Sequence, residues 1–316
     1  MQLTRLGVGK LVLVDQAEST LVGLVTTLRE EHGFYDSVPA LADIRNAHRV
    51  AAVFDQHRPD VVFHAAANKH VPFVQAQPLE GVASNVLGTE HMVEAARRSG
   101  VVRFVLFSTD KAVEPESVLG QTKGVAEWIV GAARRDGVDG RYVAVRLGNV
   151  VDSSGSVLPL FRRQVARGGP VTVTHPEMTR YLMTASEAAG LAIVAGALAD
   201  SSGIFWLDVG PPVRVLTLAR RLARSRSVEV SIDFVGLRAG ERLHEHMLWF
   251  DDTVDATACP GVFRSPLRRV DPRWLEDSIG ALQEYVDDGA EDNVREQLAA
   301  MHAAPRGQPA LVGAVG

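Results

Sequence analysis

Short apolar runs alternate along the chain with segments whose apolar positions recur at helical spacing. The runs are rich in Val, Ile, Leu and Phe, as strands buried on both faces are. We expect strands at residues 11–15, 61–67, 103–110, 141–150 and 203–210. This alternation of strands and helices predicts an α/β protein in which helices cover both faces of a parallel sheet.

The helical segments carry termination signals that agree with this prediction. They span residues 21–33, 85–100 and 120–137, and a further helix is expected near 273–302. Each of the first three ends in glycine, which suits the left-handed residue that often follows a helix. Arginines lie near the ends of the second and third segments, where the helix dipole favours cations.

The pattern changes near residue 150 to loops, short helices and frequent Pro and Gly. We expect a doubly wound sheet domain over 1–150 and 181–210, and a smaller substrate-binding subdomain over 151–180 and 211–300. Residues 301–316 are mostly small and contain Pro and Gly, which predicts a flexible tail.

Composition narrows the class of protein. The formal net charge is −5 over 316 residues, which argues against a nucleic-acid partner because phosphate binding needs a basic surface. The single cysteine, Cys259, excludes an intrachain disulfide and a cysteine-cluster metal site, and it suits a reducing cytoplasm. No apolar stretch reaches the roughly 18–20 residues of a membrane span, so we expect a protein that is soluble or at most peripheral to a membrane. We also expect no metal site.

Small and polar residues follow several of the expected strands. In open α/β sheets the carboxyl ends of parallel strands meet at one edge, where ligands bind. The residues brought to this edge are Asp15, Ala65, Ala66, Ala67, Ser108, Thr109, Asp110 and Asn149. Such residues are also common turn formers, so the chemistry of the edge depends on the motifs around them.

Four motifs lie around this edge: 64–89 (HAAANKHVPFVQAQPLEGVASNVLGT), 107–127 (FSTDKAVEPESVLGQTKGVAE), 145–184, which contains HPEMTRYLMT, and 236–247 (GLRAGERLHEHM). From about residue 4 to about residue 265 the chain resembles the polysaccharide-biosynthesis UDP-N-acetylglucosamine 4,6-dehydratases, of the extended short-chain dehydrogenase/reductase superfamily. The resemblance implies a Rossmann-like fold and a lyase that uses NAD to convert a UDP-N-acetylhexosamine into a 4-keto-6-deoxy sugar. That product would feed glycan or natural-product biosynthesis.

The STDKAV motif holds the reacting groups that the resemblance implies. In that reaction a hydride leaves C4 of the sugar, the C5 proton becomes acidic, the C6 hydroxyl departs and the hydride returns to C6. The family's pattern makes Lys111 the base at C5, Asp110 the acid for the leaving hydroxyl, and Thr109 a hydrogen-bond partner near O4. Lys123 matches the lysine that holds the nicotinamide ribose. A carboxyl beside an ammonium can bring both pKa values toward neutrality when partly desolvated, as acid–base catalysis requires.

Three positions depart from the family's pattern. Leu119 stands where the superfamily usually has a tyrosine, and a leucine cannot relay a proton. The O4 proton would then pass to Asp110 through Thr109 or a water. Gln75 replaces a usual glutamate, and Asp152-Ser153-Ser154 replaces a Gly-Ser-Arg-like sequence, so substrate preference or rate can differ from the family's.

The resemblance also assigns binding residues. Asp15 would bind the adenosine ribose, and Asp43 and Ile44 the adenine; an acid at position 15 without a basic neighbour favours NAD over NADP. Arginines suit the diphosphate of a UDP-sugar because their planar fork donates two hydrogen bonds at once. The further cofactor positions are Ala65, Ala66, Ala67, Lys69 and Lys123, and the substrate positions are Lys69, His70, Asn149, Arg180, Arg238 and Glu241.

Dinucleotide folds begin with a strand and a glycine-rich turn that faces the pyrophosphate, and the sequence shows no such segment. Gly7-Val8-Gly9 precedes the strand at 11–15 and aligns with a later turn. Either the chain is a truncated reading of a longer protein, which we favour, or the sheet closes with 11–15 beside 61–67. In the second case the chain is a weakened or non-catalytic nucleotide-sugar-binding relative or subunit.

Two further expectations follow from the resemblance. Epimerisation of a UDP-sugar at C4 or C5 on the same scaffold is an alternative to dehydration. Helices 85–99 and 121–135 resemble the pair through which the superfamily dimerises as a four-helix bundle, so a homodimer or higher homo-oligomer is expected.

Overall fold

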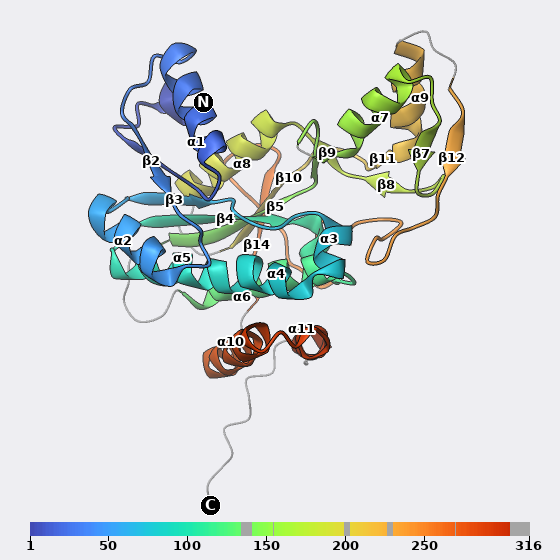
Figure 1. Ribbon diagram of the computed structural model, residues 1–316. Coiled ribbons are helices and arrows are strands. Elements are labelled where there is room, and N and C mark those ends of the chain that lie inside the picture. The colour runs from blue at the N-terminus through green and yellow to red at the C-terminus, as the bar shows by residue number, and fades with distance from the viewer. Residues whose placement is uncertain (134–140, 154, 199–202, 226–229, 269, 304–316) are drawn as a thin grey trace, which may run out of the picture.

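Four of the five expected apolar runs, all except 11–15, form the centre of a six-stranded sheet with the strand order β13-β14-β10-β5-β4-β3 (Figure 1). The structure, a computed structural model, describes residues 1–133, 141–153, 155–198, 203–225, 230–268 and 270–303. The central strands β3, β4, β5 and β10 are parallel, and β14 is antiparallel to both of its neighbours. The fold is therefore α/β with a mostly parallel sheet, as predicted. The bounds are β3 (Val61–His64), β4 (Arg103–Thr109), β5 (Arg141–Leu147), β10 (Ile204–Leu207), β13 (Asp255–Ala256) and β14 (Val262–Ser265).

Helices cover both faces of this sheet because the central strands alternate their buried side chains between the two sides. Phe104 and Leu106 of β4 pack into a core shared with α5 and α6, whereas Val105 packs against α8 on the opposite face. All three side chains are fully buried. The helices of these layers are α2 (Ala47–His57), α5 (Gly88–Arg98), α6 (Val118–Ala132) and α8 (Ala185–Leu198).

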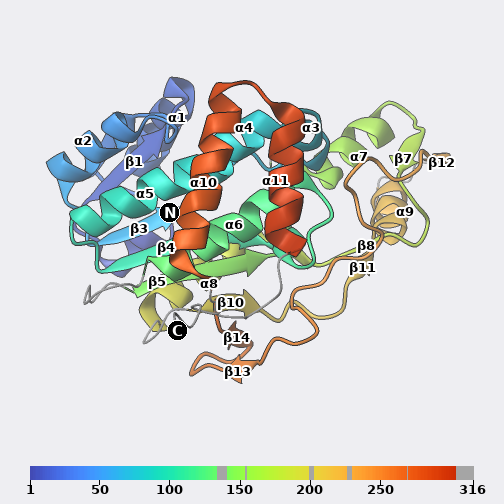
Figure 2. The same ribbon diagram turned by 90° about the horizontal axis from the view of Figure 1, so that it is seen from below.

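A helical hairpin forms a further layer against α6 (Figures 1 and 2). Leu282 and Leu298 of the hairpin are 0% exposed and belong to the same core as α5 and α6. Its last turn is fixed by His302, whose Nε2 lies 2.9 Å from the carbonyl oxygen of Gln121 on α6. The single helix expected near 273–302 is thus two helices joined by a turn, α10 (Pro272–Asp287) and α11 (Glu291–Ala303).

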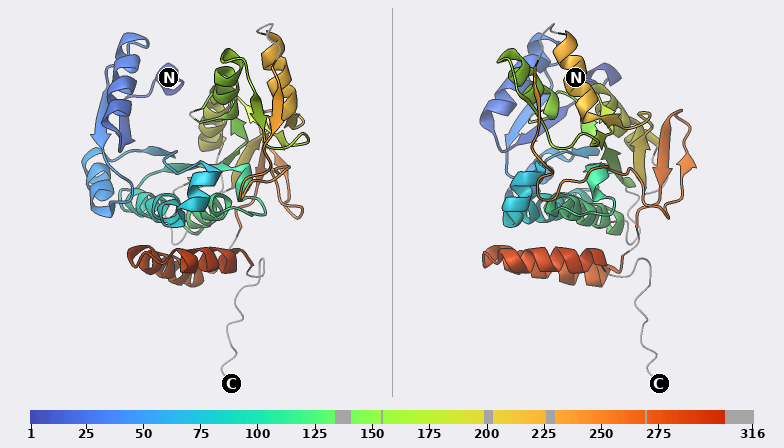
Figure 3. Two further views of the ribbon diagram at one scale, coloured as in Figure 1. Left: turned by 45° about the vertical axis from the view of Figure 1, so that its right-hand side comes forward. Right: turned by 90° about the vertical axis from the view of Figure 1, so that its right-hand side faces the viewer.

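The N-terminal strands form a separate two-stranded parallel sheet, in which β1 pairs with β2. The alternative in which the sheet closes with 11–15 beside 61–67 is wrong, because β1 and β3 share no ladder. Among the described residues, β1 and β3 each have one strand neighbour, so each keeps one unpaired edge. Figure 3 shows this unit rising from one end of the main sheet. Its elements are η1 (Leu3–Leu6), β1 (Leu11–Asp15), α1 (Glu18–Glu30) and β2 (Ser37–Leu41).

A smaller subdomain rises at the other end of the same side of the sheet (Figure 3). It has its own core, which contains Phe161, Val171 and Ala219, each fully buried. Part of the segment 211–300 expected there lies elsewhere, because β14 joins the main sheet and the α10–α11 hairpin packs on α6. The elements of the subdomain are α7 (Val157–Ala166), β7 (Val171–Val173), β8 (Thr179–Arg180), β11 (Val213–Arg214), α9 (Val215–Ser225) and β12 (Ile232–Phe234).

Two strands end before their apolar runs do. The run 61–67 leaves the sheet after His64, so the three alanines form the connection to α3. The run 141–150 breaks at Gly148, where a Cβ atom would lie 2.6 Å from the carbonyl oxygen of Tyr181. The remaining elements are α3 (Val71–Ala76), α4 (Pro78–Val82), η2 (Ala83–Leu87), η3 (Asp110–Ala112), β6 (Asn149–Val150) and β9 (Leu182–Met183).

Two expectations about the chain as a whole meet the structure only in part. Within the described ranges, no helix is long and apolar enough to span a membrane. The flexible tail expected over 301–316 lies outside the described residues from residue 304 onward, and residues 301–303 belong to α11.

Candidate active site

The end of β4 brings a hydroxyl, a carboxyl and an ammonium to one point. Lys111 Nζ donates to Asp110 Oδ1 over 2.8 Å, and Thr109 Oγ1 donates to the same oxygen over 2.9 Å. The Asp110 side chain is 0% exposed and that of Lys111 is 17% exposed. The site thus holds a buried carboxyl oxygen, Asp110 Oδ2, that has no hydrogen-bond partner among the described residues.

Two residues from other elements complete this cluster. Asn149 Oδ1, at the start of β6, accepts from Lys111 Nζ at 3.4 Å. Glu245 Oε1 lies 3.7 Å from Lys111 Nζ and 3.9 Å from Arg180 Nη2. Burial raises the pKa of the Glu245 carboxyl, Lys111 lowers it and Asp110 raises it further. Glu245 lies within the motif 236–247 but was not predicted from the sequence, because a buried glutamate in a loop cannot be told from a surface glutamate by sequence alone.

Lys123 lies on α6 behind the same strand end. It is only 5% exposed, and burial lowers the pKa of its ammonium to about 8, with Glu127 acting in the opposite direction. No described residue accepts a hydrogen bond from Lys123 Nζ. Leu119, one turn earlier on α6, is 4% exposed and packs in the main core, so it brings no polar atom to the site.

A buried ion pair that the sequence analysis also missed fixes α6 to the sheet. Arg146 on β5 donates to both carboxylate oxygens of Glu127, over 3.0 and 2.8 Å. Ser108, next to Thr109 on β4, donates to Glu127 Oε1 over 2.6 Å. This network joins β4, β5 and α6 directly beneath the catalytic candidates, and it therefore limits how far they can move.

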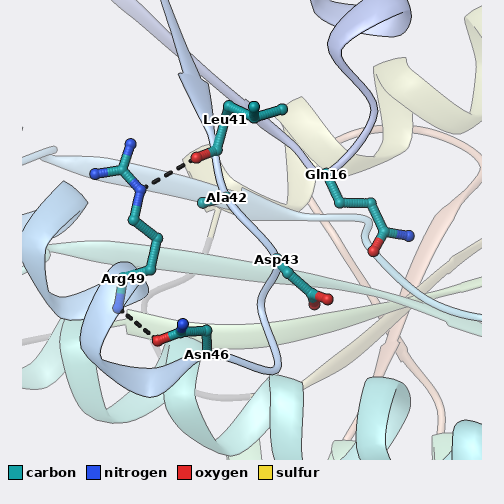
Figure 4. A pocket seen from close by; sticks show the side chains of 6 residues that line it. All are labelled: Gln16, Leu41, Ala42, Asp43, Asn46 and Arg49. Atoms are coloured by element: carbon teal, nitrogen blue, oxygen red, sulfur yellow. Dashed lines mark hydrogen bonds between the residues drawn. The ribbon is translucent and has the colours of Figure 1, made fainter.

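The residues expected to bind adenosine lie at the carboxyl ends of β1 and β2. Asp43 lines an open cavity of about 400 Å³ (Figure 4). Asp15 Oδ1 accepts from the backbone N–H of Ala17 at the start of α1. Asp43 also forms a 2.6 Å ion pair with Arg45, whose hydrogen bond lowers the pKa of the Asp43 carboxyl. Ile44 does not line the cavity, because its side chain is buried in the main core. The lining residues are Gln16, Leu41, Ala42, Asp43, Asn46 and Arg49.

The connection after β3 carries the three alanines, Lys69 and His70. Asn85 fixes this connection, because its side chain accepts from the N–H of Asn68 over 2.8 Å and donates to the carbonyl of Asn68 over 3.0 Å. Ala65, Ala66 and Lys69 are exposed and Ala67 is half-buried. The His70 ring lies against Gly155 and 6.2 Å from the Phe73 ring.

The arginines expected at the diphosphate lie in two different settings. Arg180 is 7% exposed and donates to the carbonyl oxygens of Thr179, Arg242 and Leu243, so it clamps the loop 236–247 to β8. Arg238 is exposed, and its backbone N–H donates to Glu241 Oε2 over 3.1 Å. A role at a diphosphate stays a prediction for both arginines, and Arg180 in addition holds the loop that carries Glu245.

Two of the departures have clear structural settings. Gln75 Oε1 accepts from the backbone N–H of Val118 over 3.0 Å at the start of α6. Gly240 packs against the side-chain amide of Gln75. Asp152 has a positive φ of 61° and binds both terminal nitrogens of Arg162. Among the described residues no group of three or more His, Cys, Asp or Glu could hold a metal ion.

Comparison with curated proteins places the chain among proteins of polysaccharide biosynthesis. A model of the family described as "Polysaccharide biosynthesis protein" matches residues 1–266. The capsular polysaccharide biosynthesis protein CapD of Staphylococcus aureus is 42% identical over 251 residues, which cover 78% of this chain and 42% of CapD. The UDP-glucose 4-epimerase of Rickettsia typhi is 34% identical over 253 residues, which cover 78% of this chain and 73% of the epimerase. The chain thus spans about two fifths of the length of CapD.

Solved structures support the same relationship. Pen from Bacillus thuringiensis superposes with a TM-score of 0.75 at 29% identity, over 81% of each chain. MoeE5, solved in complex with UDP-glucose and NAD, superposes with a TM-score of 0.64 at 21% identity, over 75% of this chain and 88% of MoeE5, and shares the fold. The match over residues 1–266 shows that this chain belongs to the polysaccharide biosynthesis protein family, within the extended short-chain dehydrogenase/reductase superfamily.

Proposed function

We propose that the chain converts a UDP-N-acetylhexosamine into a 4-keto-6-deoxy sugar, as an NAD-dependent 4,6-dehydratase does. One observation carries the proposal: the Asp110 carboxyl and the Lys111 ammonium lie 2.8 Å apart beside Asn149, at the carboxyl edge of the sheet. Dehydration across C5 and C6 needs a base that removes the proton from C5 and an acid that protonates the hydroxyl on the neighbouring C6. This pair supplies both groups.

Each group has a setting that suits one step. Lys111 as a neutral amine takes the C5 proton, and its partly exposed side chain allows it to exchange that proton with water. Asp110 as a carboxylic acid donates its proton to the C6 hydroxyl, which leaves as water. Thr109, bound to Asp110 Oδ1, can pass the O4 proton to that carboxylate in the step for which Leu119 has no polar atom.

The described residues fit a dinucleotide at its two ends. The cavity with Asp43 and the nearby Asp15 would hold the adenosine, and an acid at position 15 supports NAD rather than NADP. Lys123 would hold the nicotinamide ribose, because it is buried and its ammonium has no acceptor among the described residues. When bound there, NAD supplies the oxidation at C4 and the return of hydride to C6.

The same edge offers groups for the UDP-sugar. Lys69 and His70 follow the three alanines in the connection after β3, and Asn149 lies beside Lys111. Arg238 and Glu241 lie together on the loop 236–247, where we assign them to the diphosphate and the uridine ribose. Arg180 would act on the nucleotide mainly through this loop.

A C4 epimerase is the second candidate, favoured by the 34% identity to the UDP-glucose 4-epimerase of Rickettsia typhi. Epimerisation at C4 needs no acid for a departing hydroxyl, so the buried Asp110 oxygen argues for dehydration. A non-catalytic nucleotide-sugar-binding relative is a third reading, since Leu119 cannot relay a proton. Product analysis separates all three.

We further propose that the chain forms homo-oligomers. The α10–α11 hairpin packs on α6 here. A pairing through α5 and α6 would therefore have to include the hairpin.

The test is incubation of the purified chain with UDP-N-acetylglucosamine and NAD, followed by NMR of the sugar. We expect a 4-keto-6-deoxy product from the chain and from the control Lys10→Ala, and none from Lys111→Ala, which should still bind UDP. Formation of a C4 epimer would establish the second candidate, and UDP binding without any product would establish the third.

A further inference from the structure

Lys111 has a carboxylate on each of two sides. Asp110 Oδ1 accepts from Nζ at 2.8 Å, and Glu245 Oε1 lies 3.7 Å from the same nitrogen. The two acids come from distant parts of the chain, the end of β4 and the loop 236–247. The loop therefore delivers a second charge to a pair that the strand end has already formed.

Glu245 is buried without full compensation. Its side chain is 2% exposed, and its Oε2 is a buried oxygen to which no described residue donates a hydrogen bond. A buried carboxylate oxygen without a donor costs free energy, so a purely structural glutamate would be expected to satisfy both oxygens. Glu245 instead points one oxygen toward Lys111 and leaves the other free at the site.

Charged and polar groups surround both Lys111 and Glu245. Lys111 faces Asp110, Glu245 and the neutral amide of Asn149. Glu245 faces Lys111 and Asp110 on one side, and Arg180 and the more distant Arg242 on the other. Arg180 is already bound to three backbone carbonyls, so it anchors the loop, while Glu245 Oε1 lies 3.7 Å from Lys111 Nζ and 3.9 Å from Arg180 Nη2.

We propose that Glu245 is a positioning residue that, together with Asp110, holds the Lys111 ammonium from two sides and sets the pH at which Lys111 becomes a base. The inference deepens the proposed function, because Lys111 is the C5 base only in that reaction. Its physical core is independent of turnover: a carboxylate within 4 Å stabilises the protonated lysine.

The protonation of Lys111 can be measured directly in the intact chain. The chain has four lysines, at positions 10, 69, 111 and 123, so labelling lysine with carbon-13 at Cε gives four NMR signals. The signal lost in Lys111→Arg assigns Lys111. In Glu245→Gln we expect the pKa of Lys111 to fall by about one unit, because a charge less than 4 Å away is removed. In Glu245→Asp the shorter side chain should give a smaller fall.

The matched control is Glu94→Gln, which removes an exposed carboxylate that pairs with Arg97 and Arg98 on α5. It should leave the Lys111 titration unchanged. A Lys111 pKa that stays the same in both Glu245 variants, with or without a loss of thermal stability, would overturn the inference and leave Glu245 a structural partner of Arg180. If the pKa falls but no variant or parent chain forms product, the inference stands and the proposed function fails.

Discussion

Replacing Lys123 by methionine should make the protein more stable. Lys123 is 5% exposed, and burial lowers the pKa of its ammonium from 10.5 to about 8. One pKa unit corresponds to about 1.4 kcal/mol, so the folded state disfavours the charged form by about 3 kcal/mol. Methionine has a similar shape and no charge, so Lys123→Met should raise the free energy of unfolding at pH 7 by about 1–3 kcal/mol.

The pH dependence of stability provides a second, independent test of this prediction. Between about pH 8 and pH 10.5 the unfolded chain binds a proton at Lys123 that the folded protein does not, so the stability of the parent rises with pH in this window. Below about pH 8 both states are charged and the full penalty applies. The stability gap between Lys123→Met and the parent should therefore be constant near neutrality and shrink above pH 8.

Urea denaturation at pH 7.0 and 9.5 measures both effects, with the exposed Lys10→Met as the matched control. The control should change stability by less than about 0.5 kcal/mol. A Lys123→Met variant that is less stable than the parent at pH 7, or a gap that does not shrink with pH, would refute the reasoning. A stabilised variant with weakened NAD binding would show that the lysine is kept for ligand binding at a cost in stability.

Three further predictions concern the loop, the hairpin and acid stability. Gly240→Ala should lower the free energy of unfolding, measured by urea denaturation, by about 1–3 kcal/mol, because φ is +79° and the new Cβ would lie 2.8 Å from Gln75 Oε1. The control Gly289→Ala, with a similar φ of +69° and no atom within 4 Å of the new Cβ, should lower it by less. Leu298→Ala should cost about 2–5 kcal/mol in one cooperative transition, since Leu298 is fully buried in the main core, and an unchanged midpoint would mean that the hairpin docks separately. Burial lowers the pKa of His302 to about 4, so stability should fall as the pH drops from about 6.5 to 4, and His302→Gln should flatten that fall in thermal melts.

The sequence predicted the parts of the fold that depend on continuous apolar runs. β1 and β4 form nearly where expected, because each run is continuous and rich in branched apolar residues, although β1 is only half-buried. β2 was missed because Pro39 and the small or polar Ser37 and Ala40 interrupt its sequence, so it shows no continuous run of branched apolar residues. The absence of pairing between β1 and β3 could not be predicted from the hydrophobic pattern either, because the pattern identifies strands and does not say which strands pair.

The part of the candidate site that could be predicted consists of residues that are neighbours in one sequence motif. Thr109, Asp110 and Lys111 come together because one strand end carries all three. Glu245 and the Glu127–Arg146 pair were missed because charged residues in a sequence are usually exposed, and only the fold shows which are buried.

The most direct test of the central claim is solvent exchange at C5 of the sugar. The chain is incubated with UDP-N-acetylglucosamine and NAD in deuterium oxide, and the carbon-bound deuterium is located by NMR. If Lys111 is the C5 base, the parent chain should place solvent deuterium at C5, and Lys111→Ala, which should still bind UDP, should place none. Deuterium at C5 in Lys111→Ala, or a 4-keto-6-deoxy product that keeps its original C5 proton throughout, would contradict the assignment of this lysine as the base.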